Sequence, residues 1–209
     1  TDGSTPGNLV STAFYAGCAS QIADMAQALG KTSDAATYRT LFTNIFNAFQ
    51  NAYVSADGTV GSGSESGYVL ALHFNLVTPA QRPLVAAKLA TAVQAQNGHI
   101  STGMVTTQWL LPILTSIGRS DLAYQMLEKT DYPSWGYWIH LGATTMFEHW
   151  DSLNADGTFN ASLVSMNSLN HANFGTCAEW FYSGILGIDL LQPGFRKILI
   201  NPQIGGSVT

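Results

Sequence analysis

A carboxylate set among aromatic side chains marks the stretch of this chain that could do chemistry. Residues 132–151 contain Glu148 together with six aromatic residues, and Pro133 and two glycines interrupt the backbone there. A carboxylate can donate or accept a proton in a reaction, and an aromatic face can pack on the apolar face of a pyranose ring. The stretch therefore predicts a site that holds a polar, ring-shaped ligand such as a sugar.

Each candidate residue also has a purely structural interpretation. Glu148 could be a helix-end carboxylate that pairs with His149 or with a distant arginine. Trp135 and Trp138 could stack on a sugar, but a tryptophan in a turn with proline and glycine can equally cover the core. Glu179 lies within an apolar helical segment, where we expect a hydrogen-bonded interior carboxyl rather than a second catalyst.

The composition excludes one large class of partners. Only 10% of the residues are charged, against about 25% in an average soluble domain, a pattern that favours a secreted protein. The net charge is −5 and the chain has eight Lys and Arg residues. These cannot form the dense basic surface that binds phosphate groups, so we expect no nucleic-acid partner.

The expected location is extracellular. No apolar run approaches the roughly 20 residues that span a bilayer, and no leader pattern opens the sequence, so we expect no membrane contact and a leader that is removed or lies elsewhere. Asn160-Ala-Ser162 is a glycosylation sequon in a polar, turn-rich segment. Cys18 and Cys177 are the only cysteines, and their small-residue contexts favour two buried thiols, with a single disulfide as the alternative.

Helical periodicity dominates the chain, with Gly30 and Gly118 at the places of left-handed helix caps. Thr32, Ser33 and Asp34 offer an N-cap for the second helix. Strand-like alternation occurs only in residues 195–202. The predicted helices form three successive hairpins and span residues 9–29, 35–51, 66–75, 79–96, 105–117 and 120–130.

Successive helical hairpins fit either an open solenoid or a closed ring of paired helices, the α/α toroid. The connections favour the toroid, because they are long and rich in glycine, aromatic and polar residues instead of short and alike. If alternate connections meet at one rim, they would line a shared cleft. The connections in question are residues 52–64, 97–103, 131–143 and 151–170.

Three of these segments resemble signatures of a known family, the inverting alpha-L-rhamnosidases of glycoside hydrolase family 78. The three segments overlap the last two of these connections and the residues beside them, and they read Asp131-Tyr-Pro-Ser-Trp-Gly-Tyr137, Gly142-Ala-Thr-Thr-Met-Phe-Glu-His-Trp-Asp-Ser152 and Ser168-Leu-Asn-His-Ala-Asn-Phe-Gly-Thr-Cys-Ala-Glu-Trp180. Their order and spacing match, and two further segments, residues 98–103 and 193–198, resemble other parts of that family. Phe147 and His149 depart from the Trp and Arg that many members carry.

The resemblance implies an all-α fold, an (α/α)6 toroid of which this chain holds about half to two-thirds. Residues 1–192 would belong to the toroid and residues 193–209 would begin a C-terminal β-sandwich domain. The implied reaction removes terminal alpha-L-rhamnose from rhamnosides with two carboxyl groups and with no metal or other cofactor. Glu148 matches the general base and His171 a histidine that contacts the sugar. We expect further substrate contacts from Trp135, Trp138, His99 and Asn170.

The general acid of the family belongs to an acidic, arginine-containing motif upstream of the region matched here, and no such motif occurs in these 209 residues. We therefore expect the upstream part of the same catalytic domain to be a required partner. The isolated chain would be inactive and would leave apolar hairpin faces uncovered. The alternatives are a non-catalytic carbohydrate-binding helical module and a purely structural helical repeat.

Overall fold

The computed structural model describes residues 4–163 and 166–208. These residues form two compact units, one ending at Ala92 and the other beginning at Val93. Most of the regular structure is helical, as expected, and a two-stranded antiparallel sheet lies near the C-terminal end. No helix among the described residues combines the length and the apolar character needed to cross a bilayer.

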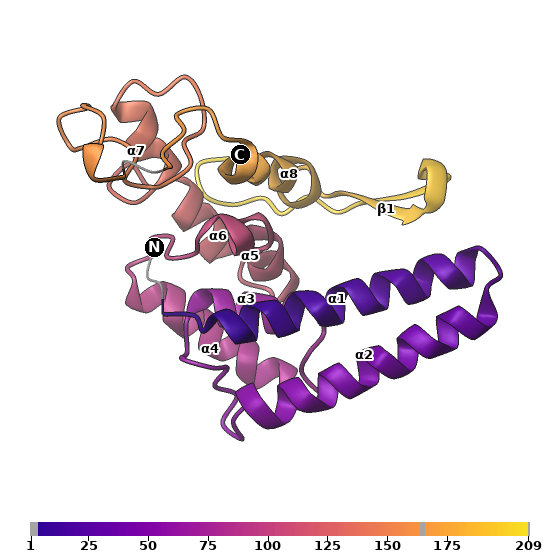
Figure 1. Ribbon diagram of the computed structural model, residues 1–209. Coiled ribbons are helices and arrows are strands. Elements are labelled where there is room, and N and C mark those ends of the chain that lie inside the picture. Colours follow the sequence, from indigo (N-terminus) through magenta and orange to yellow (C-terminus); the bar gives the residue numbers. More distant parts are fainter. Residues whose placement is uncertain (1–3, 164–165, 209) are drawn as a thin grey trace. The chain divides into compact units, whose positions relative to one another are not determined.

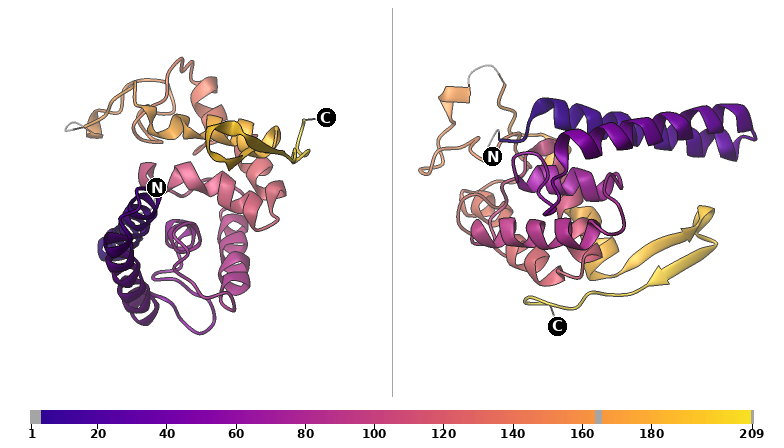
Figure 2. Two further views of the ribbon diagram at one scale, coloured as in Figure 1. Left: turned by 90° about the vertical axis from the view of Figure 1, so that its right-hand side faces the viewer. Right: turned by 90° about the horizontal axis from the view of Figure 1, so that it is seen from below.

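The first unit opens with a hairpin of two long helices, α1 (Gly7–Ala28) and α2 (Thr32–Tyr53), which run side by side (Figures 1 and 2). Gly30 has the predicted left-handed conformation, with φ of +72°, and the backbone N–H of Lys31 donates to the carbonyl of Ala26 at 2.8 Å. The predicted N-cap at Thr32–Asp34 is wrong, because this tight turn leads the chain straight into α2 and Thr32 is already helical.

Two shorter helices complete the first unit, α3 (Glu65–His73) and α4 (Arg82–Ala95). Ser64 caps α3, since its hydroxyl accepts from the Gly67 N–H at 3.2 Å. The start predicted for α4 at residue 79 is three residues early. Thr78 and Gln81 form a reciprocal capping box, with bonds of 2.9 and 3.3 Å between side chain and backbone, and the α-helix proper begins after that turn.

The second unit begins with α5 (Met104–Ser116) and α6 (Ser120–Leu127), the third predicted hairpin. Gly118 between them has the predicted positive φ, +77°. Beyond α6 the helices are short and separated by irregular backbone, which carries the signature segments. The remaining helical elements are α7 (Trp135–His140), η1 (Ala161–Leu163), η2 (Ala172–Thr176), α8 (Cys177–Trp180) and η3 (Phe181–Ile185).

A β-hairpin follows these helices. Strand β1 (Ile188–Gln192) and strand β2 (Lys197–Ile200) pair antiparallel around the short helix η4 (Pro193–Phe195) and extend away from α8 (Figure 1). The sequence predicted β2 but missed β1. The predicted domain boundary after residue 192 falls between the two strands and stays a prediction.

The two cysteines are free thiols in different environments. Cys177 is buried as expected, and burial raises the pKa of its thiol to about 11. Cys18 is exposed, which overturns the expectation of two buried thiols. Its small neighbours on α1 indicated a tight helix contact but not which face of the helix makes it.

The packing of α1 generates a stability prediction. A methyl group added at Gly17 would lie 2.3 Å from the ring of Phe74, whereas one added at Gly7 meets nothing within 4 Å. Gly17→Ala should therefore lower the free energy of unfolding by about 1–3 kcal/mol, although alanine favours helix. Gly7→Ala should be neutral or stabilising by up to about 1 kcal/mol. Thermal unfolding of both variants is the measurement, and equal stability of the two would contradict the contact.

Candidate active site

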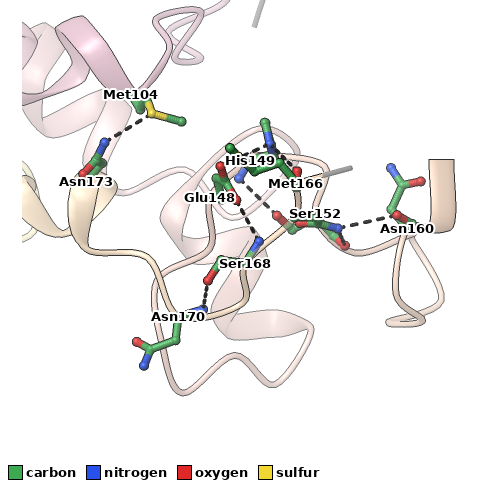
Figure 3. A network of polar contacts seen from close by, with 10 residues as sticks. Met104, Glu148, His149, Ser152, Asn160, Met166, Ser168, Asn170 and Asn173 are labelled. Carbon is green, nitrogen blue, oxygen red and sulfur yellow. Dashed lines mark hydrogen bonds and ion pairs between the residues drawn. The ribbon is translucent and has the colours of Figure 1, made fainter. Parts of the chain in front are cut away.

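Two segments that lie far apart in the sequence pair in the second unit, residues 145–148 and residues 168–171. The Glu148 N–H donates to the carbonyl of Ser168 at 2.9 Å, and the His171 N–H donates to the carbonyl of Met146 at 2.8 Å. The hydroxyl of Thr145 also donates to the carbonyl of Leu169. These bonds bring together two signature segments that the sequence could only place in order along the chain (Figure 3).

The carboxylate of Glu148 lies at the centre of this pairing. Its side chain is 7% exposed, and Oε2 accepts a hydrogen bond from the Ser168 N–H at 2.8 Å. Oε1 accepts no hydrogen bond from the described residues, and its nearest ionisable neighbour is Nε2 of His149 at 3.9 Å. One oxygen is thus fixed by the backbone, which orients the carboxylate, while the other is left for a further partner.

His149 is held beside this carboxylate by its own contacts. Its Nε2 lies 3.1 Å from the carbonyl of Met166, and its backbone N–H donates to the hydroxyl of Ser152 at 3.0 Å. Ser152 is fully buried, and its carbonyl accepts from the side-chain amide of Asn167 at 3.1 Å. The distance of 3.9 Å makes His149 a neighbour of Glu148 and not a hydrogen-bond partner.

A cluster of five buried aromatic rings stands behind the pairing. Trp138 stacks on Trp150 with ring centres 4.5 Å apart, and the other rings pack at tilted or edge-on angles. Such pairs contribute about 0.5–1.5 kcal/mol each beyond the burial of their area. The rings are 2–6% exposed and belong to Trp135, Trp138, Phe147, Trp150 and Phe174.

The indole N–H groups of this cluster donate to backbone carbonyls in a short 3-10 helix, a turn and a loop. Trp135 donates to Phe174 at 2.9 Å, Trp138 to Trp150 at 3.0 Å and Trp150 to Thr102 at 3.2 Å. Buried carbonyls outside helices and sheets need such partners. The cluster therefore fixes the irregular backbone around Glu148 and connects it to the segment 98–103.

Trp135 and Trp138 also reach a surface cavity of about 260 Å³. Both side chains are therefore part of the core, as one of the two interpretations expected, and they also line this cavity, whereas stacking on a sugar stays a prediction. The cavity wall is mostly apolar, with two threonines from the segment that leads to Glu148. Its lining residues are Trp135, Trp138, Ile139, Ala143, Thr144, Thr145 and Met146.

The other predicted substrate contacts lie in two places. Asn170 and His171 belong to the segment paired with Glu148; Asn170 is exposed, and Nδ1 of His171 is buried without a hydrogen-bond partner among the described residues. A buried ring nitrogen without a partner is unusual in a folded protein. His99 instead contacts Asp131, with Nε2 2.9 Å from the carboxylate, and this contact lowers the pKa of Asp131.

The expectation for Glu179 is wrong. Its side chain is exposed and borders a second cavity of about 300 Å³, together with Thr115 and Asp189. The buried residue of that turn is the adjacent Trp180, whose indole donates to the hydroxyl of Thr115 at 2.7 Å. Apolar neighbours in the sequence therefore did not place Glu179 on the inner face.

Sequence reasoning missed the residues that hold the site together. Ser168 acts through its backbone, and Ser152 and Asn167 act through small polar side chains that carry no recognisable spacing. Asp131 was visible as part of a signature segment but without a partner. Among the described residues no group of three or more His, Cys, Asp or Glu side chains is placed to hold a metal ion.

Comparison with known proteins identifies the class to which this fold and site belong. The family model described as bacterial alpha-L-rhamnosidase 6 hairpin glycosidase domain matches residues 1–185. The chain belongs to this family, and the resemblance seen in the sequence is confirmed.

Individual relatives agree. An alpha-L-rhamnosidase of Streptomyces avermitilis is 46% identical over 205 residues, 98% of this chain and 20% of its own length. One of Alteromonas sp. (strain LOR) is 39% identical over 204 residues, 97% of this chain and 22% of its own length. The chain therefore spans about a fifth of the length of these relatives.

Solved structures show the same similarity. The crystal structure of the S. avermitilis alpha-L-rhamnosidase complexed with L-rhamnose superposes with a TM-score of 0.92 at 46% identity, over 98% of this chain and 20% of that one. A native rhamnosidase from Aspergillus terreus gives 0.93 at 30% identity, over 99% of this chain and 24% of that one.

The tryptophan contacts generate a second stability prediction. Trp135→Phe removes the indole N–H and leaves the buried carbonyl of Phe174 without its donor. The free energy of unfolding should fall by about 1–3 kcal/mol. Thermal unfolding measures this loss, and Tyr182→Phe, at a side chain that is 64% exposed, is the control with little expected change. Unchanged stability together with weaker rhamnose binding would show that the indole serves the ligand and not the core.

Proposed function

We propose that this chain is part of the catalytic domain of an inverting alpha-L-rhamnosidase, in which Glu148 is the general base. The observation that carries the proposal is the geometry of its carboxylate, which is nearly buried, fixed through Oε2 by the Ser168 N–H and unpaired at Oε1 among the described residues. The names of the relatives, alpha-L-rhamnosidases, support rhamnosides as the substrate class, and we propose terminal alpha-L-rhamnose as the sugar that is removed.

The proposed reaction uses Glu148 to activate a water molecule. Oε1 accepts a proton from the water, whose oxygen attacks the anomeric carbon on the face opposite the leaving group. A second carboxyl group, roughly 6.5–9.5 Å from the first, protonates the departing oxygen. We place this general acid in a part of the catalytic domain beyond these 209 residues, in keeping with the fifth of the relatives' length that the chain spans. By itself the chain would then be inactive.

The sugar would lie against the segments that surround Glu148. Trp135 and Trp138, which line the cavity, would offer an apolar wall for the C–H face of the ring. Nδ1 of His171, buried and without a partner, is ready to accept or donate a hydrogen bond to a hydroxyl. Asn170 lies next to it in the exposed part of the same segment. His99, on a separate loop, is the last of the proposed substrate-contacting residues.

The proposal includes the ring of helical hairpins. A closed (α/α)6 toroid covers each hairpin on both sides, and α1 presents large apolar side chains that are 36–73% exposed in the described structure, on Tyr15, Ile22, Met25 and Leu29. Upstream hairpins of the same domain would cover such faces.

We also propose that the protein is exported. Glycosylation of the sequon would then modify the side-chain amide of Asn160. In the described structure this amide donates to the carbonyl of Asp151 at 2.8 Å, a hydrogen bond that the modification would have to accommodate.

A substitution in the full-length protein tests the role of Glu148. Glu148→Gln keeps the acceptor for the Ser168 N–H but cannot take a proton from water. Turnover of a rhamnoside should fall by about 10²- to 10⁴-fold, with KM little changed. Glu179→Gln, at an exposed carboxylate, is the matched control and should keep normal turnover. Near-normal turnover of the Glu148 variant would reject the assignment and leave a sugar-binding module as the alternative.

A further inference from the structure

Two turns in this chain share a sequence and a shape. Ser55-Ala-Asp-Gly-Thr-Val60 lies in the first unit and Asn154-Ala-Asp-Gly-Thr-Phe159 in the second. An antiparallel bridge closes each turn, between Val54 and Val60 in one and between Leu153 and Phe159 in the other.

The two turns share the same backbone hydrogen bonds and the same pairing of aspartate with threonine. The N–H of Ser55 donates to the carbonyl of Thr59 at 2.9 Å, and the N–H of Asn154 donates to that of Thr158 at 2.8 Å. The central glycines have φ of +85° and +82°. In each turn the aspartate accepts from both the N–H and the hydroxyl of the threonine two residues on, at 2.6–3.0 Å.

These internal bonds explain the Asp, Gly and Thr of each turn. They also lower the pKa of Asp156. They do not explain the last residue, which in both turns is large and apolar. The surroundings of that residue differ between the two turns.

The first turn is seated on helix α4. Gly58 lies so close that an added methyl group would be 2.7 Å from Cβ of Leu84, and the Lys88 ammonium contacts the carboxylate of Asp57 at 2.8 Å. The hydrogen bond from Lys88, with those from Thr59, holds the pKa of Asp57 at about 2. The turn thus contacts, through Asp57 and Gly58, a helix that presents an aliphatic residue and, four residues on, a cation. Val60, which ends the turn, is fully buried and lies beside Gly67 of α3.

The second turn packs on no such helix within the described residues. A methyl group added at Gly157 would meet nothing within 4 Å, and Asp156 has no ion pair with a described residue. Phe159 is 49% exposed where its counterpart Val60 is 0% exposed. Asp156 and Gly157, which correspond to the two residues by which the first turn contacts α4, thus have no such contact among the described residues, and an exposed phenyl ring follows them.

We propose that the turn of residues 153–159 is a docking site for a helix from the remaining part of the same catalytic domain, one that presents an aliphatic residue and, four residues on, a Lys or Arg. Two observations define this partner: Asp156 calls for a positive charge, and the first turn contacts Leu84 and Lys88 of α4. The proposal rests on the proposed completion of the helical ring but not on the role of Glu148.

Photocrosslinking in the full-length protein tests the docking directly. Phe159 is replaced by p-benzoylphenylalanine, which preserves the phenyl ring, and the crosslinked peptide is identified by mass spectrometry. The expected product joins position 159 to a helical peptide outside residues 1–209 that carries an aliphatic residue four positions before a Lys or Arg. A product within residues 1–209, a crosslinked dimer of two copies or no product would each overturn the proposal.

A second variant tests the charge. Asp156→Asn keeps the acceptor for Thr158 but removes the charge, so the yield of the crosslink should fall several-fold, and added salt should reduce the yield of the parent protein in the same direction. An unchanged yield in both tests would show that no cation faces Asp156. Because neither readout uses hydrolysis, failure of the docking site is distinguishable from failure of Glu148 as the base.

Discussion

The site depends on the pairing of residues 145–148 with residues 168–171. Glu148 takes part twice, since its backbone N–H donates to the carbonyl of Ser168 and its side chain accepts from the N–H of the same residue. The pairing of the two segments thus places the N–H that orients the carboxylate. The geometry of the proposed base is therefore a property of the fold and not of one flexible side chain.

Regular secondary structure contributes little to holding these segments. Helix α7 has six residues, and the neighbouring 3-10 helices have three and five. The aromatic cluster holds the segments instead, because each of its three indole groups donates to a backbone carbonyl of another part of the site. Burial of the rings and satisfaction of the carbonyls thus come from the same side chains, which explains why Trp135 and Trp138 can line a cavity and still belong to the core.

Local sequence signals predicted the local structure well. Apolar periodicity located α1, α5 and the hairpins, and Gly30 and Gly118 marked their turns, because a left-handed cap depends on one residue. The N-cap of α2, strand β1 and the faces of Cys18 and Glu179 were missed, since each depends on what the segment packs against. The residue types at the site, above all Glu148, were visible in the sequence, whereas the backbone bond from Ser168 was not.

Rescue of an inactive Glu148→Gly variant by azide is the most direct measurement of the central claim. Loss of the carboxylate should abolish hydrolysis, and azide in its place should attack the anomeric carbon from the same side as the water. We predict that azide restores turnover of an alpha-L-rhamnoside and yields the rhamnosyl azide of inverted, β configuration, as measured by NMR. A product of retained α configuration, or hydrolysis by the variant without azide at the normal rate, would contradict it.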